Sequence, residues 1–175
     1  MSAIIRRAAV TDAEALALVG RATFLETYAG QLPAADILVH CARQHAPDIY
    51  AGWLADERCR LWLVEAEEGG APVGYAVLSP PDLPVATTPT DVEIKRIYLL
   101  HRFQGRGLGA ALMRAVLDEA RDVGFERALL GVFGRNEAAI GFYRRQGFQQ
   151  AGERKFQVGA SVFDDLVLAR PLGRN

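Results

Sequence analysis

The sequence predicts an α/β fold of the mixed, α+β kind, and three features of the chain lead to that class. The 175 residues are 50% hydrophobic and 23% charged, which fits a single compact domain over residues 1–175 and excludes a disordered chain. Strand-like segments in the first half come in pairs joined by short turns, as in antiparallel hairpins. Later in the chain, strands and helices alternate.

The N-terminal region is predicted to contain one short strand followed by helices. Residues 4–5 open the strand, and Thr11 and Glu14 have the spacing of a capping box, which predicts a helix starting at Thr11. Gly30 is the expected C-cap of this helix. Residues 31–58 read as further helix, interrupted by two prolines.

The rest of the chain is predicted to alternate between hairpins and helices. Residues 61–66 and 73–78 form an antiparallel hairpin, and the proline-rich residues 80–90 form a surface loop. The remaining elements are expected as strands over 92–100, 128–133, 154–158 and 162–169 and as helices over 105–123 and 136–146.

The strand over residues 92–100 contains an irregularity in its apolar pattern. Apolar side chains fall at positions 92 and 94 and then at 97 and 99, so the pattern changes from even to odd positions. One regular strand with one buried face cannot accommodate that change, whereas a β-bulge near Lys95–Ile97 can. The alternative is a strand buried on both faces near its end. A bulge would leave backbone amides free to bind an extended ligand or an oxyanion.

A glycine-rich turn follows this strand and leads into a helix. The turn reads Gln104-Gly105-Arg106-Gly107-Leu108-Gly109-Ala110, and the free amides of the helix that follows suit a pyrophosphate. Its spacing also matches a dinucleotide fingerprint, but the next strand does not end in the acidic residue that this fingerprint needs. A turn without function is the remaining alternative.

Positive charge is concentrated around this turn. The net charge is −1, yet residues 94–117 contain no acidic residue and five cationic ones, Lys95, Arg96, Arg102, Arg106 and Arg114. This asymmetry predicts a compact anionic ligand held at one place. The net charge of −1 gives the protein as a whole no general attraction to nucleic acid.

A second motif follows the next strand. Asn136 is a suitable N-cap for the helix over residues 136–146, and Ala139, Ile140 and Tyr143 share one face of it. Helical periodicity alone favours Tyr143 as a core tyrosine with a satisfied hydroxyl.

Taken together, the two motifs resemble those of the GNAT superfamily of acetyl-CoA-dependent N-acetyltransferases. The motifs are Gln104-x-x-Gly107-x-Gly109 before one helix and Asn136-x-x-Ala139-x-x-Phe142-Tyr143-x-x-x-Gly147-Phe148 after the next strand. More narrowly, residues 24–28, 92–98 and 130–133 are similar to those of bacterial spermidine/spermine N-acetyltransferases. Members often have Trp where this chain has Phe133, which indicates a difference on the acceptor side.

The resemblance implies a mostly antiparallel central sheet flanked by helices, and it assigns a role to each motif residue. The backbone of Ile97, Tyr98 and Leu99 would pair with the pantetheine arm of acetyl-CoA. The amides of Gly105, Arg106, Gly107, Leu108, Gly109 and Ala110 would bind the pyrophosphate, with Gln104 leading into the turn. Asn136 would contact the cofactor arm, and Tyr143 would lie near the thioester sulfur as the general acid.

The acceptor implied by the resemblance is a primary amine of a small molecule, with a polyamine as the favoured class. Glu93 on the bulged strand is the candidate general base, directly or through water, and the Leu99 amide is the candidate oxyanion donor. A glutamate that faces solvent or pairs with a neighbouring cation is the alternative. Glu26 and Asp36 are candidate contacts for a cationic acceptor. A peptide acceptor and an acetyl-CoA sensor without turnover stay open.

Several other classes of protein are excluded or disfavoured by the sequence. His40, Cys41 and His45 do not have the spacing of a standard zinc site, so no metal is expected. No apolar run approaches the roughly 18 residues of a membrane span, and the N-terminus lacks the apolar region of a secretory signal. Two cysteines are too few for a disulfide framework. We expect a cytoplasmic protein, with a homodimer as an open alternative.

Overall fold

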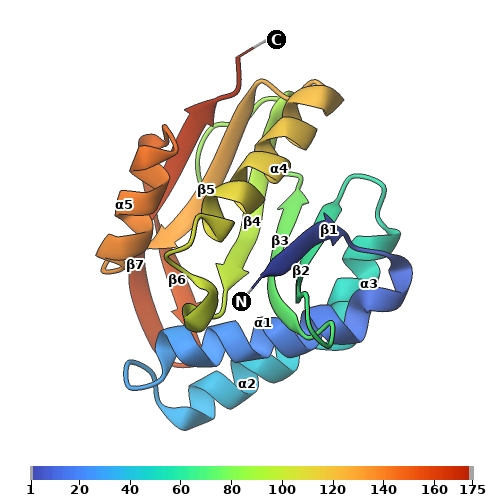
Figure 1. The fold of residues 1–175 in the computed structure, drawn as a ribbon. Coiled ribbons are helices and arrows are strands. Elements are labelled where there is room, and N and C mark those ends of the chain that lie inside the picture. Colours follow the sequence, from blue (N-terminus) through green and yellow to red (C-terminus); the bar gives the residue numbers. More distant parts are fainter. Residues whose placement is uncertain (1, 174–175) are drawn as a thin grey trace.

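A computed structural model describes residues 2–173, and its seven strands form one sheet (Figure 1). The strand order is β1-β2-β3-β4-β5-β7-β6, and every neighbouring pair is antiparallel except β4 and β5. The strands are β1 (Ala3–Arg7), β2 (Arg60–Ala66), β3 (Pro72–Ser79), β4 (Asp91–Leu99), β5 (Arg127–Phe133), β6 (Gln149–Val158) and β7 (Ser161–Pro171). The mixed α/β prediction is confirmed, and β6 begins earlier than the sequence pattern predicted.

Helices cover both faces of the sheet. The longer helices are α1 (Ala13–Tyr28), α2 (Ala34–Gln44), α3 (Pro47–Ala55), α4 (Leu108–Val123) and α5 (Glu137–Arg145). Apolar side chains of α4 and α5 pack with one face of the sheet in the largest core cluster, whereas those of α1 and α3 pack against the other face. Two prolines separate α1, α2 and α3, as predicted: Pro33 precedes α2 and Pro47 opens α3.

The start of α1 differs from the sequence prediction. Residues Val10–Asp12 form a short 3₁₀ turn, and α1 begins after it, so Thr11 is not the N-cap. Asp12 instead caps the 3₁₀ turn, because its Oδ2 accepts the Ala9 N–H at 2.6 Å, and it makes no side-chain cap bond to α1. Its carboxylate also binds the guanidinium of Arg6 on β1. The prediction missed this ion pair, which ties the turn to the first strand.

The bulge predicted in β4 is present. Val77 of β3 lies opposite Arg96, whereas the next residue, Leu78, lies opposite Ile94, so Lys95 has no partner on β3. The extra residue changes the phase of the strand. As a result, Ile94 before the bulge and Leu99 after it both join the core cluster under α4. This geometry explains the change from even to odd apolar positions.

The sheet divides between β4 and β5. These two strands pair only from Asp91 to Glu93 on β4, opposite Arg127 to Leu129 on β5. Beyond this point β5 stays paired with β7 through Phe133, while β4 stays paired with β3. Figure 1 shows the two strands close together near the top of the view and apart below. We call the unpaired region between them the β4–β5 opening.

Candidate active site

Two backbone amides of β4 point into the β4–β5 opening. The Leu100 N–H donates to the Val73 carbonyl, toward β3. Because successive amides of a strand point to opposite edges, the Tyr98 amide also faces β3, whereas those of Ile97 and Leu99 face away from it. On that side β5 has already separated from β4. Ile97 and Leu99 therefore present donors to an extended ligand.

The glycine-rich turn lies at the end of the same strand. Gly105 and Gly107 have positive φ angles of 78° and 79°, a conformation that glycine adopts without strain. Gly107 is the N-cap of α4, and the first backbone bond of the helix runs from the Ala111 N–H to the Gly107 carbonyl. The amides of Leu108, Gly109 and Ala110 therefore lie at the helix N-terminus, where backbone donors have no partner within the helix. This arrangement fits a phosphate group.

Gln104 holds the turn against the strand. Its side-chain amide donates to the Leu99 carbonyl at 3.0 Å. On the side of the turn toward β1, a pocket of about 370 Å³ is lined by Ser2, Ala3, Phe103, Arg106, Gly107, Leu108 and Ala111. The turn is thus accessible from this pocket, and Arg106 is one of the residues that line it.

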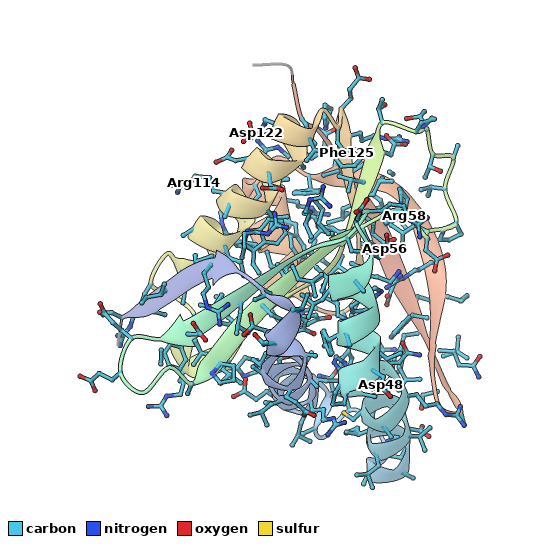
Figure 2. The ribbon with its side chains drawn as sticks, turned by 90° about the vertical axis from the view of Figure 1, so that its right-hand side faces the viewer. Asp48, Asp56, Arg58, Arg114, Asp122 and Phe125 are labelled. Atoms are coloured by element: carbon cyan, nitrogen blue, oxygen red, sulfur yellow. The ribbon has the colours of Figure 1, made fainter. Side chains whose placement is uncertain are left out.

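The cationic segment does not form a single patch, contrary to the prediction. Arg96 lies against α3, where it donates to the Tyr50 hydroxyl at 2.8 Å and stacks over the Trp53 ring. Lys95 is 3.9 Å from Glu93. Arg114 projects outward from α4 (Figure 2). Of the five charges, those on Arg102 and Arg106 lie in or next to the turn.

Tyr143 is on α5 beside the opening. Its ring packs edge-on against Phe142 and Phe148, and its side chain is only partly buried. Burial raises the pKa of its phenol, and the phenol of Tyr98 adds to that shift. The hydroxyl therefore stays protonated through the neutral range. Periodicity alone had favoured a core tyrosine.

Asn136 begins α5, as predicted. Its Oδ1 accepts the Ala139 N–H at 3.0 Å, and this hydrogen bond caps the N-terminus of α5. This bond uses the side-chain oxygen, so the side-chain NH₂ is the group left for a ligand.

Glu93 is buried beneath the proline-rich loop on the face opposite α4. It is 2% exposed, and its Oε2 accepts the Asp82 N–H at 2.7 Å. Its Oε1 lies 3.9 Å from the Lys95 ammonium. The carboxylate is therefore oriented by the loop.

The two acidic residues suggested as acceptor contacts are bonded within the protein. Glu26 accepts the His101 N–H at 2.9 Å, next to the glycine-rich turn. Asp36 accepts the Ser161 hydroxyl at 3.2 Å and thereby ties α2 to the β6–β7 turn.

Sequence analysis missed an acidic residue next to the opening. Asp165 on β7 is 3% exposed, lies opposite Phe133 of β5 and forms an ion pair with Arg154 of β6. Alternation along β7 was the available signal, because it places Asp165 on the same face as Phe163 and Val167. A carboxylate among apolar residues on that face is unusual.

Neither a metal cluster nor a membrane-spanning helix was found in residues 2–173. No group of three or more His, Cys, Asp or Glu side chains there could hold a metal ion. His45 is buried beside the Tyr50 hydroxyl, and burial lowers its pKa to about 2. No helix within the same residues has the length and apolar character to cross a membrane.

This fold and these motifs define a class of acyltransferase. The sequence matches the family model described as "Acetyltransferase (GNAT) family" over residues 21–148. The chain therefore belongs to the GNAT family and is an acetyl-CoA-dependent acetyltransferase.

Individual relatives agree with this assignment. The chain is 35% identical over 163 residues to an uncharacterised N-acetyltransferase of Mycobacterium tuberculosis, covering 93% of this chain and 99% of the relative. It is 36% identical over 110 residues to the N-alpha-acetyltransferase RimI of the same species, covering 63% and 66% of the two chains. A structure of the PaiA N-acetyltransferase of Thermoplasma acidophilum with coenzyme A has the same fold, with a TM-score of 0.75, 18% identity and coverage of 98% and 99%.

Proposed function

We propose that this acetyltransferase acetylates a primary amine of a small molecule, with a polyamine as the favoured class, in a ternary complex. The observation that carries the proposal is the β4–β5 opening. The amides of Ile97 and Leu99 face it from one strand, and Phe133 and Asp165 lie on the strands of the other side. An amine entering from the α1 side would meet aromatic rings and one carboxylate before it reached β4.

The donor side of the site uses backbone groups. The Ile97 amide would pair with the pantetheine arm, and the Leu99 amide would face the thioester carbonyl. The Tyr98 amide faces β3, so the pairing expected of its backbone is left to these two neighbours. The amides from Gly105 to Ala110 would bind the pyrophosphate, and Asn136 would contact the arm from α5. Bound acetyl-CoA supplies an acetyl group activated as a thioester.

The incoming amine must lose a proton before it can attack. An amine with the pKa of a lysine, about 10.4, costs roughly 4–5 kcal/mol to deprotonate at pH 7. Glu93 is the proposed base, and it acts through water because the loop that binds its Oε2 also covers it.

Two further groups complete the proposed mechanism. The Leu99 amide donates to the carbonyl oxygen as negative charge develops there. The Tyr143 phenol holds the proton that the departing sulfur receives. The amine attacks directly, so no covalent enzyme intermediate forms.

A peptide N-terminus is the second candidate acceptor. The similarity to the N-alpha-acetyltransferase RimI is the observation in its favour. The bond between Asp36 and Ser161 favours the small molecule, because it ties the β6–β7 turn to α2 across the acceptor side. We also propose a cytoplasmic location.

Release of free thiol from acetyl-CoA tests the proposal. The acceptors are 1,4-diaminobutane, spermidine, an aminoglycoside, free amino acids and short peptides with free N-termini. We expect the highest kcat/KM with a small amine. A preference for peptides would assign the second candidate, and acetyl-CoA binding without thiol release from any acceptor would indicate a sensor.

A further inference from the structure

One oxygen of the buried Asp165 carboxylate has no partner. Arg154 donates to Oδ2 twice, from Nε at 3.1 Å and from Nη2 at 3.0 Å. Oδ1 is buried and accepts no hydrogen bond from residues 2–173. Leaving a buried carboxylate oxygen unsatisfied is costly, so such an atom requires an explanation.

The side chains around Asp165 suit a cation. Phe133 lies directly opposite Asp165 on β5, and its ring centroid is 5.2 Å from that of Phe163 and 6.2 Å from that of Tyr28. Aromatic faces attract ammonium groups, and the attraction increases where water is excluded. The Asp165 carboxylate is thus paired across the sheet with one member of a cluster of three rings, and such surroundings suit an alkylammonium.

The guanidinium of Arg154 does not bond Oδ1, because it lies over Gly131 and the Phe156 ring. The guanidinium fills the space over Gly131, where an added Cβ would come within 2.5 Å of its Cζ. It also packs over the Phe156 ring at 5.0 Å. From this position both of its bonds to Asp165 reach the same oxygen, Oδ2.

Asp165 is electrostatically connected to the reaction site. Asp165 and Arg154 both shift the pKa values of Tyr28 and Tyr98, in opposite directions. Tyr98 lies on β4 between the two amides that face the opening. Tyr98 and Arg154 are only partly buried, so the region around Asp165 extends to the surface.

The charge of Asp165 indicates which nitrogen of the acceptor it binds. A carboxylate stabilises the protonated form of a nearby amine, whereas the reacting amine must lose its proton. An ammonium bound at Asp165 is thus better suited to be a second group that does not react. Resting on the proposed acetylation of a small amine, we propose that Asp165 Oδ1 binds a second, non-reacting ammonium of the acceptor and thereby selects diamines.

Two acceptors of equal carbon length test this with the wild-type enzyme. 1,4-Diaminobutane has the second ammonium, and butylamine lacks it. We expect kcat/KM to be about 10-fold or more higher for the diamine, as a charge-assisted hydrogen bond of ordinary strength would give. Equal values for the two would overturn the proposal while leaving acetylation of small amines intact, as would a preferred acceptor without a second cationic group.

The variant Asp165→Asn tests the residue itself. We expect KM for 1,4-diaminobutane to rise about 10-fold, with kcat and the KM for butylamine nearly unchanged, because the carboxylate positions substrate and takes no part in proton transfer. Asp164→Asn is the matched control, since the neighbouring Asp164 side chain is 82% exposed and pairs with Lys155. It should leave both KM values unchanged.

The results separate this inference from the proposed function. An equal loss with both amines in Asp165→Asn would mean that Asp165 acts on the reacting amine or on the fold, and would overturn the inference. If Asp165→Asn does not fold, the wild-type comparison of the two amines decides alone. Absence of turnover with every amine would instead overturn the proposed function.

Discussion

At the scale of single residues, Tyr143 combines the properties that a general acid needs. Burial raises the pKa of its phenol, so the hydroxyl keeps its proton at every pH near neutrality. The ring is held edge-on by Phe142 and Phe148, which fixes where the hydroxyl lies. The contacts of the ring do not depend on the hydroxyl, so the two can be separated by mutation.

Tyr143→Phe should reduce kcat by about 100-fold, the lower range for loss of a general acid. The KM for acetyl-CoA and the melting temperature should stay close to those of the wild type, because the ring keeps its packing. Steady-state kinetics and a thermal melt measure these quantities. A kcat within twofold of the wild type would show that another group protonates the leaving thiolate.

At the scale of elements, the glycine-rich turn and the start of α4 work as one unit. Gly107 and Gly124 flank the two ends of α4, and both have positive φ angles, 79° and 100°. An alanine at either position meets similar backbone strain, roughly 1 kcal/mol or more. Only Gly107 lies among the amides proposed to bind pyrophosphate.

Gly107→Ala should therefore raise the KM for acetyl-CoA by about 10-fold or more, because relief of the strain moves the amides of the turn and weakens a charge-assisted hydrogen bond. Gly124→Ala is the matched control, with a comparable loss of stability and an unchanged KM. Kinetics at saturating acceptor, with a denaturation curve for each variant, make the comparison. Equal KM values for the two variants would remove the turn from the donor site.

The elements also show what the sequence could and could not predict. The bulge was predictable because it leaves a local trace, the change from even to odd apolar positions. The turn was predictable because its glycines and the following helix are contiguous. The Thr11 cap was predicted wrongly, because a competing ion pair between Asp12 and Arg6 involves a strand that local patterns do not see.

The site residues show the same difference between local features, which the sequence predicts, and contacts between distant segments, which it does not. The charges of the 94–117 segment were expected to act together, but the bulge turns Lys95 and Arg96 toward other partners, Glu93 and Tyr50. Asp165 was missed because its importance depends on Arg154 of a neighbouring strand. Alternation along β7 places Asp165 on an apolar face, but its pairing with Arg154 across the strands is not visible in a single linear pattern.

At the scale of the whole molecule, an ion pair joins the first residues of β4 and β5, the two strands between which the sheet divides. Asp91 is 4% exposed and accepts the Arg127 Nε–H at 2.9 Å, and its other oxygen accepts the Thr88 N–H at 2.6 Å. Asp91 and Arg127 are opposite each other at the start of the short β4–β5 pairing, which ends at Glu93 and Leu129, where the opening begins. The hydrogen bonds from Arg127 hold the pKa of Asp91 below its usual range.

Asp91→Asn should lower the free energy of unfolding at pH 7 by about 2 kcal/mol, since a buried carboxylate loses its charge-assisted bonds. A lowered folded pKa contributes stability that is fully present above the unfolded value of about 3.9. That contribution disappears as the pH falls through the folded pKa. Urea unfolding of both proteins from pH 7 to pH 2 should show the difference shrinking below about pH 4.

Asp118→Asn is the control for this titration, because Asp118 forms an exposed pair with Arg121 on α4. Its effect should stay within about 0.5 kcal/mol at every pH. A difference between Asp91→Asn and the wild type that persists unchanged to pH 2 would mean that the charge of Asp91 does not support the junction.

The division of the sheet separates the two halves of the catalytic task between different parts of the chain. In the proposed mechanism residues 97–110 bind the donor, whereas α1, α2 and the β6–β7 hairpin surround the acceptor. Mutations in α1, α2 or the β6–β7 hairpin can thus change the acceptor specificity without changing how acetyl-CoA is bound. Exchanging only α1, α2 and the β6–β7 hairpin between homologues should transfer acceptor preference, while residues 97–110 stay unchanged.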